Sequence, residues 1–233
     1  VYCEGLTLLD GLNRRILFGR ISEARFGYAQ VAAGWSGICA LPMVLSLSES
    51  EELRFDPVPE LEVLRTEHAS FRDLHLRPDT DLDLEISADS LEIRMEFEWQ
   101  DAEEVGLKLR CSPDGEEETL VRFNTNPGTR HASPGQISPL RELILDVSRS
   151  STRSDVSNRE SQRAVLEVPY GQPVELRIFL DRSVVEVIGN RQCYVGKRIY
   201  PARSDSLGVS AYSRGGGATL CSFDAWKMNA IWP

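Results

Sequence analysis

Residues 91–99 read Leu-Glu-Ile-Arg-Met-Glu-Phe-Glu-Trp. Apolar side chains hold every odd position and charged side chains every even one, so the pattern repeats every two residues. Successive side chains of a β-strand point to opposite faces of its sheet. The stretch therefore predicts a strand with one buried and one solvated face, whose odd positions pack into a shared core.

The same alternation recurs at short intervals along the chain. It is seen at Val105, Leu107 and Leu109, and turn residues Pro113-Asp114-Gly115 follow. It returns at 174–180 and again at Val185 and Val187. Only 60–65, after two prolines, favour one or two helical turns. Many short strands separated by Gly and Pro turns predict an all-β fold, an antiparallel two-sheet β-sandwich.

Three further segments have distinct patterns. Residues 1–21 place Asp10-Gly11 between apolar runs, which predicts a β-hairpin. Because a lone hairpin is marginal in water, we expect it to need a packing partner. Residues 22–37 contain three glycines and predict a connection. Residues 148–163 are almost wholly polar and predict a long surface loop, which either caps a ligand or has no such role.

Composition narrows the class of partner. The chain has 233 residues, a net charge of −10 and five cysteines. An acidic surface repels nucleic acid and anionic lipid, and no apolar run approaches the roughly 20 residues that span a bilayer. We expect no cofactor and no metal site, because the cysteines and histidines lack ligand spacing. Buried free thiols favour a cytoplasmic location. The cysteines are Cys3, Cys39, Cys111, Cys193 and Cys221.

Four stretches occur in a fixed order: 34–37 (Gly-Trp-Ser-Gly), 57–61 (Pro-Val-Pro-Glu-Leu), 180–187 (Leu-Asp-Arg-Ser-Val-Val-Glu-Val) and 198–201 (Arg-Ile-Tyr-Pro). Together they resemble the C-terminal β-sandwich module of glycoside hydrolase family 32, the β-fructofuranosidases (invertases, inulinases and levanases). In that family the catalytic carboxylates lie on an N-terminal five-bladed propeller. The resemblance implies that residues 1–37 are the last propeller hairpin and crossing segment, and 38–233 the sandwich domain.

The most specific of these stretches is 180–187. Asp181, Arg182 and Ser183 are expected to form a turn between two strands, and Arg182 is expected to pair with a carboxylate such as Glu186. Trp35 is expected to fill the seam between propeller and sandwich. We interpret these five residues as a structural motif. The sequence departs from the family at Ile188, where phenylalanine is usual.

The family's catalytic motifs are not found. The nucleophile in that family belongs to Asn-Asp-Pro-Asn, the transition-state stabiliser to Arg-Asp-Pro, and the acid/base Glu precedes a Cys. Here Phe55 precedes Asp56-Pro57, Cys3-Glu4 has the reverse order, and 124–127 read Asn-Thr-Asn-Pro. Retaining hydrolysis needs two carboxylates about 5 Å apart. We therefore predict no catalytic residue in this chain, which alone should be inactive.

Two roles for the chain stay open beside that of a structural remnant. One is the non-catalytic part of a fructofuranosidase acting on sucrose or fructans, which braces the propeller and adds oligomer or carbohydrate contacts. It predicts that residues 1–37 bind a propeller or self-associate. The other is a free-standing carbohydrate-binding or adhesion module. Aromatic candidates for sugar stacking, for which packing is the preferred interpretation, are Trp35, Trp99, Trp226, Trp232, Tyr194 and Tyr212.

Overall fold

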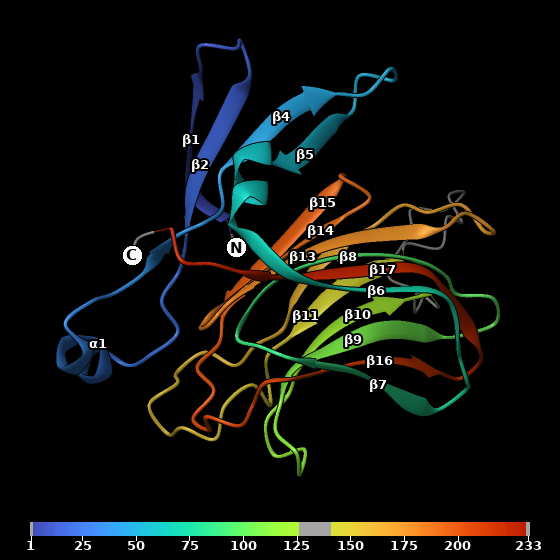
Figure 1. Cartoon of the computed structure of the whole chain (residues 1–233). Helices are drawn as coiled ribbons and strands as arrows, with labels where there is room; N and C mark the ends of the chain where they lie inside the picture. The colour runs from blue at the N-terminus through green and yellow to red at the C-terminus, as the bar shows by residue number, and fades with distance from the viewer. Residues whose placement is uncertain (1, 126–140, 232–233) are drawn as a thin grey trace, which may run out of the picture.

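The computed structural model describes residues 2–125 and 141–231. Two six-stranded antiparallel sheets face each other, and a smaller sheet stands on one of them (Figure 1). The first, which we call the β10 sheet, has the order β12-β11-β10-β9-β16-β7. Its strands are β7 (Thr80–Ser87), β9 (Glu104–Cys111), β10 (Thr119–Asn124), β11 (Glu142–Asp146), β12 (Gln162–Val165) and β16 (Gly208–Arg214).

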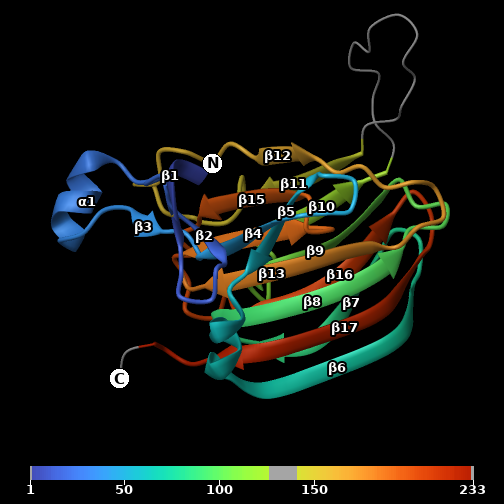
Figure 2. The same ribbon diagram turned by 90° about the horizontal axis from the view of Figure 1, so that it is seen from above.

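The second, which we call the β13 sheet, has the order β15-β14-β13-β8-β17-β6. Its strands lie over those of the β10 sheet (Figure 2). They are β6 (Arg65–Leu76), β8 (Ser90–Glu98), β13 (Val174–Asp181), β14 (Val184–Gly189), β15 (Cys193–Arg198) and β17 (Ala218–Met228). These layers confirm the predicted antiparallel two-sheet β-sandwich.

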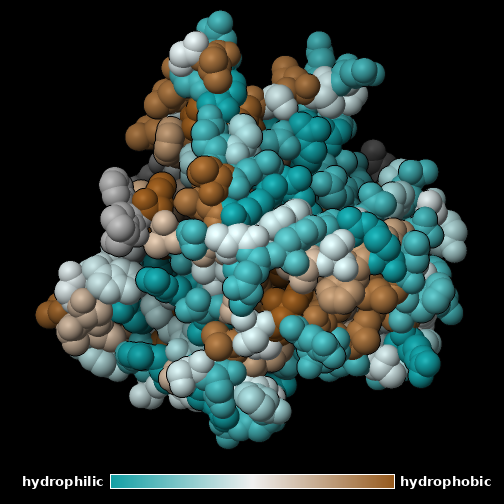
Figure 3. Space-filling view, in the orientation of Figure 1, coloured by the Kyte–Doolittle hydropathy of each residue, from teal (hydrophilic) through white to brown (hydrophobic). Residues whose placement is uncertain are grey.

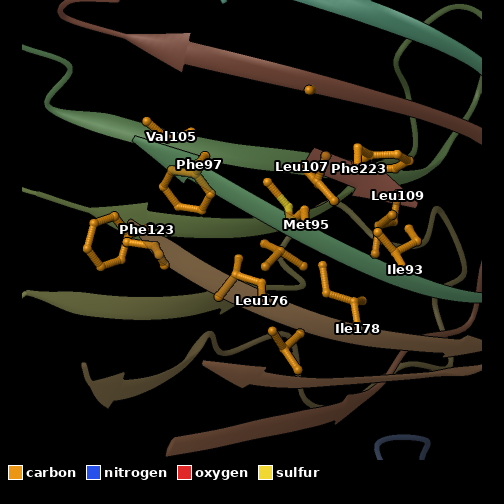
Figure 4. Packing of buried hydrophobic residues seen from close by; sticks show 14 of the residues in the cluster. Ile93, Met95, Phe97, Val105, Leu107, Leu109, Phe123, Leu176, Ile178 and Phe223 are labelled. Atoms are coloured by element: carbon orange, nitrogen blue, oxygen red, sulfur yellow. The ribbon is translucent and has the colours of Figure 1, made fainter. Parts of the chain in front are cut away.

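The core lies between the two sheets. On β8 the odd positions Ile93, Met95 and Phe97 are fully buried, and they pair with Ile178, Leu176 and Val174 of β13, as the alternation predicted. Val105, Leu107 and Leu109 of β9 enter the core from the opposite sheet (Figure 4). Full burial of each such side chain contributes about 1.5–3 kcal/mol, so this core is the main source of stability.

The predicted hairpin belongs to a third, small sheet. Strand β1 (Tyr2–Leu9) pairs with β2 (Arg15–Ile21), and Asp10 closes the turn by accepting the amides of Leu12 and Arg14. β2 also pairs with β3 (Ile38–Cys39) and β4 (Met43–Leu47), and β4 pairs with β5 (Leu53–Pro57). The small sheet therefore combines strands from both sides of position 37, and the boundary placed there stays a prediction.

Two short helices flank the small sheet. The helix α1 (Gly27–Ala33) lies within residues 22–37, the segment that connects β2 to β3. Its residues are mostly good helix formers, and Gly34, at φ 74°, ends it by donating its amide to Gln30 and Val31. The helical turns expected at 60–65 are confirmed as a 3₁₀ helix, η1 (Pro59–Leu64).

The polar segment 148–163 is only partly a surface loop. Ser150 and Ser151 are buried, and β12 begins at Gln162. Its middle also packs on the connection that precedes α1, since Phe26 donates its amide to Asp155 and Ser157 donates its amide to Ala24. The expectation of buried thiols is wrong for Cys39, which is exposed, and Cys111, Cys193 and Cys221 are only partly buried. Within the described ranges, no helix has the length and apolar character needed to cross a membrane.

Candidate functional site

Strand β14 is buried on both faces. Val185 and Val187 point into the sandwich core, whereas Val184 and Ile188 lie on the outer face of the β13 sheet. The small sheet covers that outer face: Val184 packs with Ile21 and Ala40, and Ile188 packs with Met43 and Phe179. We call this contact between the small sheet and the outer face of the β13 sheet the junction.

Glu186 lies in the middle of the junction, between these two apolar clusters. Its side chain is 3% exposed. The two carboxylate oxygens accept the backbone amide of Leu41, each at 3.1 Å, and Oε2 accepts the Tyr194 hydroxyl at 2.6 Å. Leu41 belongs to the segment that joins β3 to β4, so the carboxylate ties the small sheet to the sandwich. Burial raises the pKa of Glu186 to about 7, although both hydrogen bonds lower it.

Gly196 makes room for this hydrogen bond. It pairs with Glu186 across β14 and β15, and a Cβ at this position would lie 2.2 Å from the Tyr194 hydroxyl. Real contacts that short do not occur, so a side chain at 196 would displace the tyrosine. The absence of a side chain at 196 therefore positions the donor to Glu186.

A second buried carboxylate, Glu92, lies on the same outer face. It is fully buried on β8 and forms ion pairs with Arg65 at 2.7 Å, Arg177 at 2.9 Å and Arg94 at 3.2 Å. Burial raises its pKa, but the hydrogen bond from Arg65 and the charges of Arg177 and Arg65 outweigh it, so the net pKa is lowered. Trp226 supports Arg65, whose guanidinium lies 4.2 Å from the ring centroid.

A third polar cluster closes the junction near α1. Glu23 forms a salt bridge with Arg25 at 2.9 Å and accepts the Tyr200 hydroxyl. Burial raises the pKa of Glu23, yet the hydrogen bonds from Arg25 and Tyr200 outweigh it, and the net pKa is well below its usual range. Trp35, half-exposed, lies over Arg25 at 4.2 Å and over Arg198 at 4.9 Å. Aromatic rings thus contact both guanidiniums, and the Glu23 carboxylate binds that of Arg25.

Arg198 links this cluster to the predicted turn motif. It is almost completely buried and donates from Nη2 to the Ser183 hydroxyl at 2.8 Å. Its Nε and Nη1 atoms are buried without a hydrogen-bond partner among the described residues, and burial lowers its pKa. Ser183 also accepts the amide of Ile199 on its backbone oxygen. Ser183 is therefore the residue through which the turn holds β15.

The other motif residues lie apart from these contacts. Asp181 ends β13, and Arg182, at φ 49°, stands in the exposed turn. The expected pairing of Arg182 with Glu186 is wrong, because the Glu186 carboxylate points to Leu41 and Tyr194 on the outer face. The two residues are close in sequence, but Arg182 lies in an exposed turn whereas Glu186 is buried on β14.

The aromatic candidates are mostly engaged in packing. Trp99 and Tyr212 are buried, and Tyr212 donates to Glu104 at 2.9 Å. Trp226 stacks on His68 with 4.7 Å between ring centroids. Tyr194 bonds to Glu186, and Trp232 lies outside the described residues.

Asp56, in the Asp-Pro pair that resembles a catalytic motif, is bound by Arg191. Nε and Nη2 of that arginine lie 2.7 and 2.6 Å from the carboxylate. Both residues border a cavity of about 330 Å³ between β5 and the outer face of the β13 sheet. Asn126 and Pro127, which complete the other look-alike stretch, lie outside the described residues.

Sequence reasoning missed Leu41 and Tyr194 as members of the junction, and Glu92 as a buried carboxylate of the same outer face. A signal for Glu186 was present, since it is the one charge in an apolar run whose length indicates burial on both faces. Its partners are far along the chain, so spacing alone did not identify them.

The sandwich, the small sheet and the junction together define an all-β domain of the β-sandwich class. The model of the family described as "Glycosyl hydrolases family 32 C terminal" matches residues 60–227 of this chain. The chain therefore belongs to glycosyl hydrolase family 32 and corresponds to the C-terminal part of that family.

Individual relatives agree with this assignment. The acid beta-fructofuranosidase of Vigna radiata var. radiata is 29% identical over 94% of this chain and 38% of its own length. That of Phaseolus vulgaris is 28% identical over 99% of this chain and 40% of its own length. The chain thus spans about two-fifths of the curated relatives it matches.

Solved structures share the fold. Fructan 1-exohydrolase IIa from Cichorium intybus superposes with a TM-score of 0.85 at 20% identity, covering 98% of this chain and 48% of that chain. Exo-inulinase from Aspergillus awamori has a TM-score of 0.77 at 20% identity, covering 99% of this chain and 44% of that chain.

Proposed function

We propose that this chain is the non-catalytic part of a β-fructofuranosidase that hydrolyses sucrose or fructans, and that it braces the catalytic propeller. The names of the relatives, which include acid beta-fructofuranosidases and a fructan 1-exohydrolase of Triticum aestivum, support this substrate class. The brace is the small sheet, which the junction holds on the sandwich.

The arrangement of carboxylates supports a non-catalytic role. Glu92 and Glu186 are the buried carboxylates of the outer face, and one strand, β13, lies between theirs. Strand spacing puts their Cα atoms about 10 Å apart, with Phe179 between them, and retaining hydrolysis needs two carboxyl groups about 5 Å apart that both face the substrate. Glu92 is neutralised by arginines and Glu186 is enclosed by protein groups, so neither is presented to a substrate.

The hairpin face carries the proposal. Leu6 pairs with Phe18 and Leu8 with Ile16, so the four side chains share one face of the small sheet. Leu17, of opposite orientation, packs toward Met43 and the sandwich. The face with Leu6, Leu8 and Phe18 therefore points away from the sandwich; these three side chains are exposed, and Ile16 beside them is buried.

Apolar residues gather on this projecting hairpin in Figure 3. An open apolar face of this kind indicates a protein contact. In the complete enzyme we assign that contact to the propeller, and in the chain alone we expect self-association.

Light scattering over a concentration series tests the proposal. The chain should self-associate, and Leu8→Asp combined with Phe18→Asp should make it monomeric while circular dichroism stays that of a folded sandwich. Val63→Asp is the matched control, because Val63 is equally apolar and 84% exposed but lies on η1. A chain that is monomeric at high concentration, or association that survives the hairpin substitutions, contradicts the proposal.

A further inference from the structure

Glu186 is a buried carboxylate without a cation. No ion pair to it occurs in the ranges 2–125 and 141–231, and its hydrogen bonds come from one backbone amide and one tyrosine hydroxyl. Neutral donors of this kind do not offset the cost of burying a full charge. Burial therefore favours the protonated form of Glu186, whereas the arginines around Glu92 favour its ionised form.

The position of Glu186 couples that sensitivity to the small sheet. The carboxylate holds the amide of Leu41, and on either side of Leu41 the chain is fixed to the small sheet. Ala40 donates its amide to Gly19, and Met43 begins β4, which pairs with β2. If the segment around Leu41 lifts from the sandwich, water reaches the carboxylate and the cost of its charge falls.

We propose that Glu186 is a proton-sensitive latch: protonated, it holds the segment around Leu41 and the small sheet on the β13 sheet, and ionised, it weakens that hold. The latch acts within this chain and does not depend on a propeller. It uses no group beyond the carboxylate, the Leu41 amide and the Tyr194 hydroxyl.

The groups that face Glu186 leave its charge uncompensated. From β15 it meets Tyr194, from β13 Phe179, and from the segment before β4 it meets Leu41. The charge that acts on it is the carboxylate of Asp181, at the end of β13, which raises the pKa of Glu186 further. The neighbours therefore favour the neutral acid.

Linkage gives the sign and size of the effect. The pKa of Glu186 rises from an ordinary 4.5 to about 7 in the closed junction. The contribution of Glu186 to holding the segment around Leu41 on the β13 sheet is therefore largest below pH 4.5 and is lost progressively as the pH rises to about 7. Between about pH 5 and about pH 8.5 the equilibrium constant for this docked state should fall on the order of 100-fold.

Hydrogen exchange of the Leu41 amide measures this equilibrium directly. Its protection factor, corrected for the intrinsic rate, should fall on the order of 100-fold from about pH 5 to about pH 8.5. Amides of β9, in the other sheet, serve as the internal reference. Protection of Leu41 that changes no more than theirs overturns the proposal.

Two variants separate the latch from other titrations. Glu186→Gln keeps an acceptor for Leu41 and cannot ionise, so its protection factor should not vary across this range. Tyr194→Phe removes a donor that lowers the pKa, so the midpoint should move to higher pH. A Gln variant with the pH dependence of the parent chain, or a Phe variant with an unchanged midpoint, overturns the proposal.

Discussion

Glu92 and Glu186 lie opposite the same residue, Phe179, on its two sides. Phe179 of β13 pairs with Glu92 of β8 in one direction and with Glu186 of β14 in the other. Both carboxylates are buried on one face of one sheet, yet the pKa is lowered at Glu92 and raised at Glu186. Arginines surround Glu92 and apolar side chains surround Glu186, so the local partners decide the direction of the pKa shift.

Replacing Glu92 with glutamine should destabilise the chain by about 3–5 kcal/mol, because three arginines lose their buried counter-charge. Urea unfolding at neutral pH measures this change. Glu67→Gln is the matched control, with a side chain 75% exposed, and should stay within about 0.5 kcal/mol. Because the pKa of Glu92 is lowered, its contribution should be present above pH 4.5 and lost as the pH falls below that value. A Glu92 variant as stable as the parent chain contradicts this account.

Replacing Gly196 with alanine should cost about 1–3 kcal/mol, since the new methyl group collides with the Tyr194 hydroxyl. Thermal or urea unfolding gives the value. Gly11→Ala is the control, because no heavy atom lies within 4 Å of the position its Cβ would take. Equal effects of the two substitutions would show that Tyr194 is not fixed as described.

Ser183 and Arg182 are neighbours with different expected effects. Ser183→Ala should cost about 1–3 kcal/mol, because the buried Arg198 guanidinium loses its hydrogen-bond acceptor. Arg182→Ala, in the exposed turn, should change the free energy of unfolding by less than about 0.5 kcal/mol. The reverse order, measured by urea unfolding, would assign the motif's structural role to the arginine.

The sandwich was predictable from local pattern alone. Residues 91–99 alternate strictly and 174–178 repeat the pattern, and an alternating strand has only one way to bury its apolar side chains. The small sheet was only half predictable. The turn at Asp10-Gly11 indicates the hairpin, but the pairing of β2 with β4 depends on residues across an intervening helix, and the short strands β3 to β5 carry no distinctive pattern.

The junction shows the same limit more sharply. The motif containing Ser183 and Glu186 could be recognised, and its structural role inferred. Their partners could not be identified, because the Leu41 amide lies 145 residues from Glu186 and Arg198 lies 15 residues from Ser183. Nearness in sequence pointed instead to Arg182, which the turn directs into solvent.

Fructose release by the purified chain, supplied with sucrose, inulin or levan, tests the central claim most directly. A module that lacks the family's catalytic motifs, and whose buried outer-face carboxylates are engaged by protein groups, should release no fructose above the uncatalysed background. Robust release that is abolished by Glu186→Gln, Glu92→Gln or Asp56→Asn, in variants that remain folded, would show that this chain holds an active site of its own.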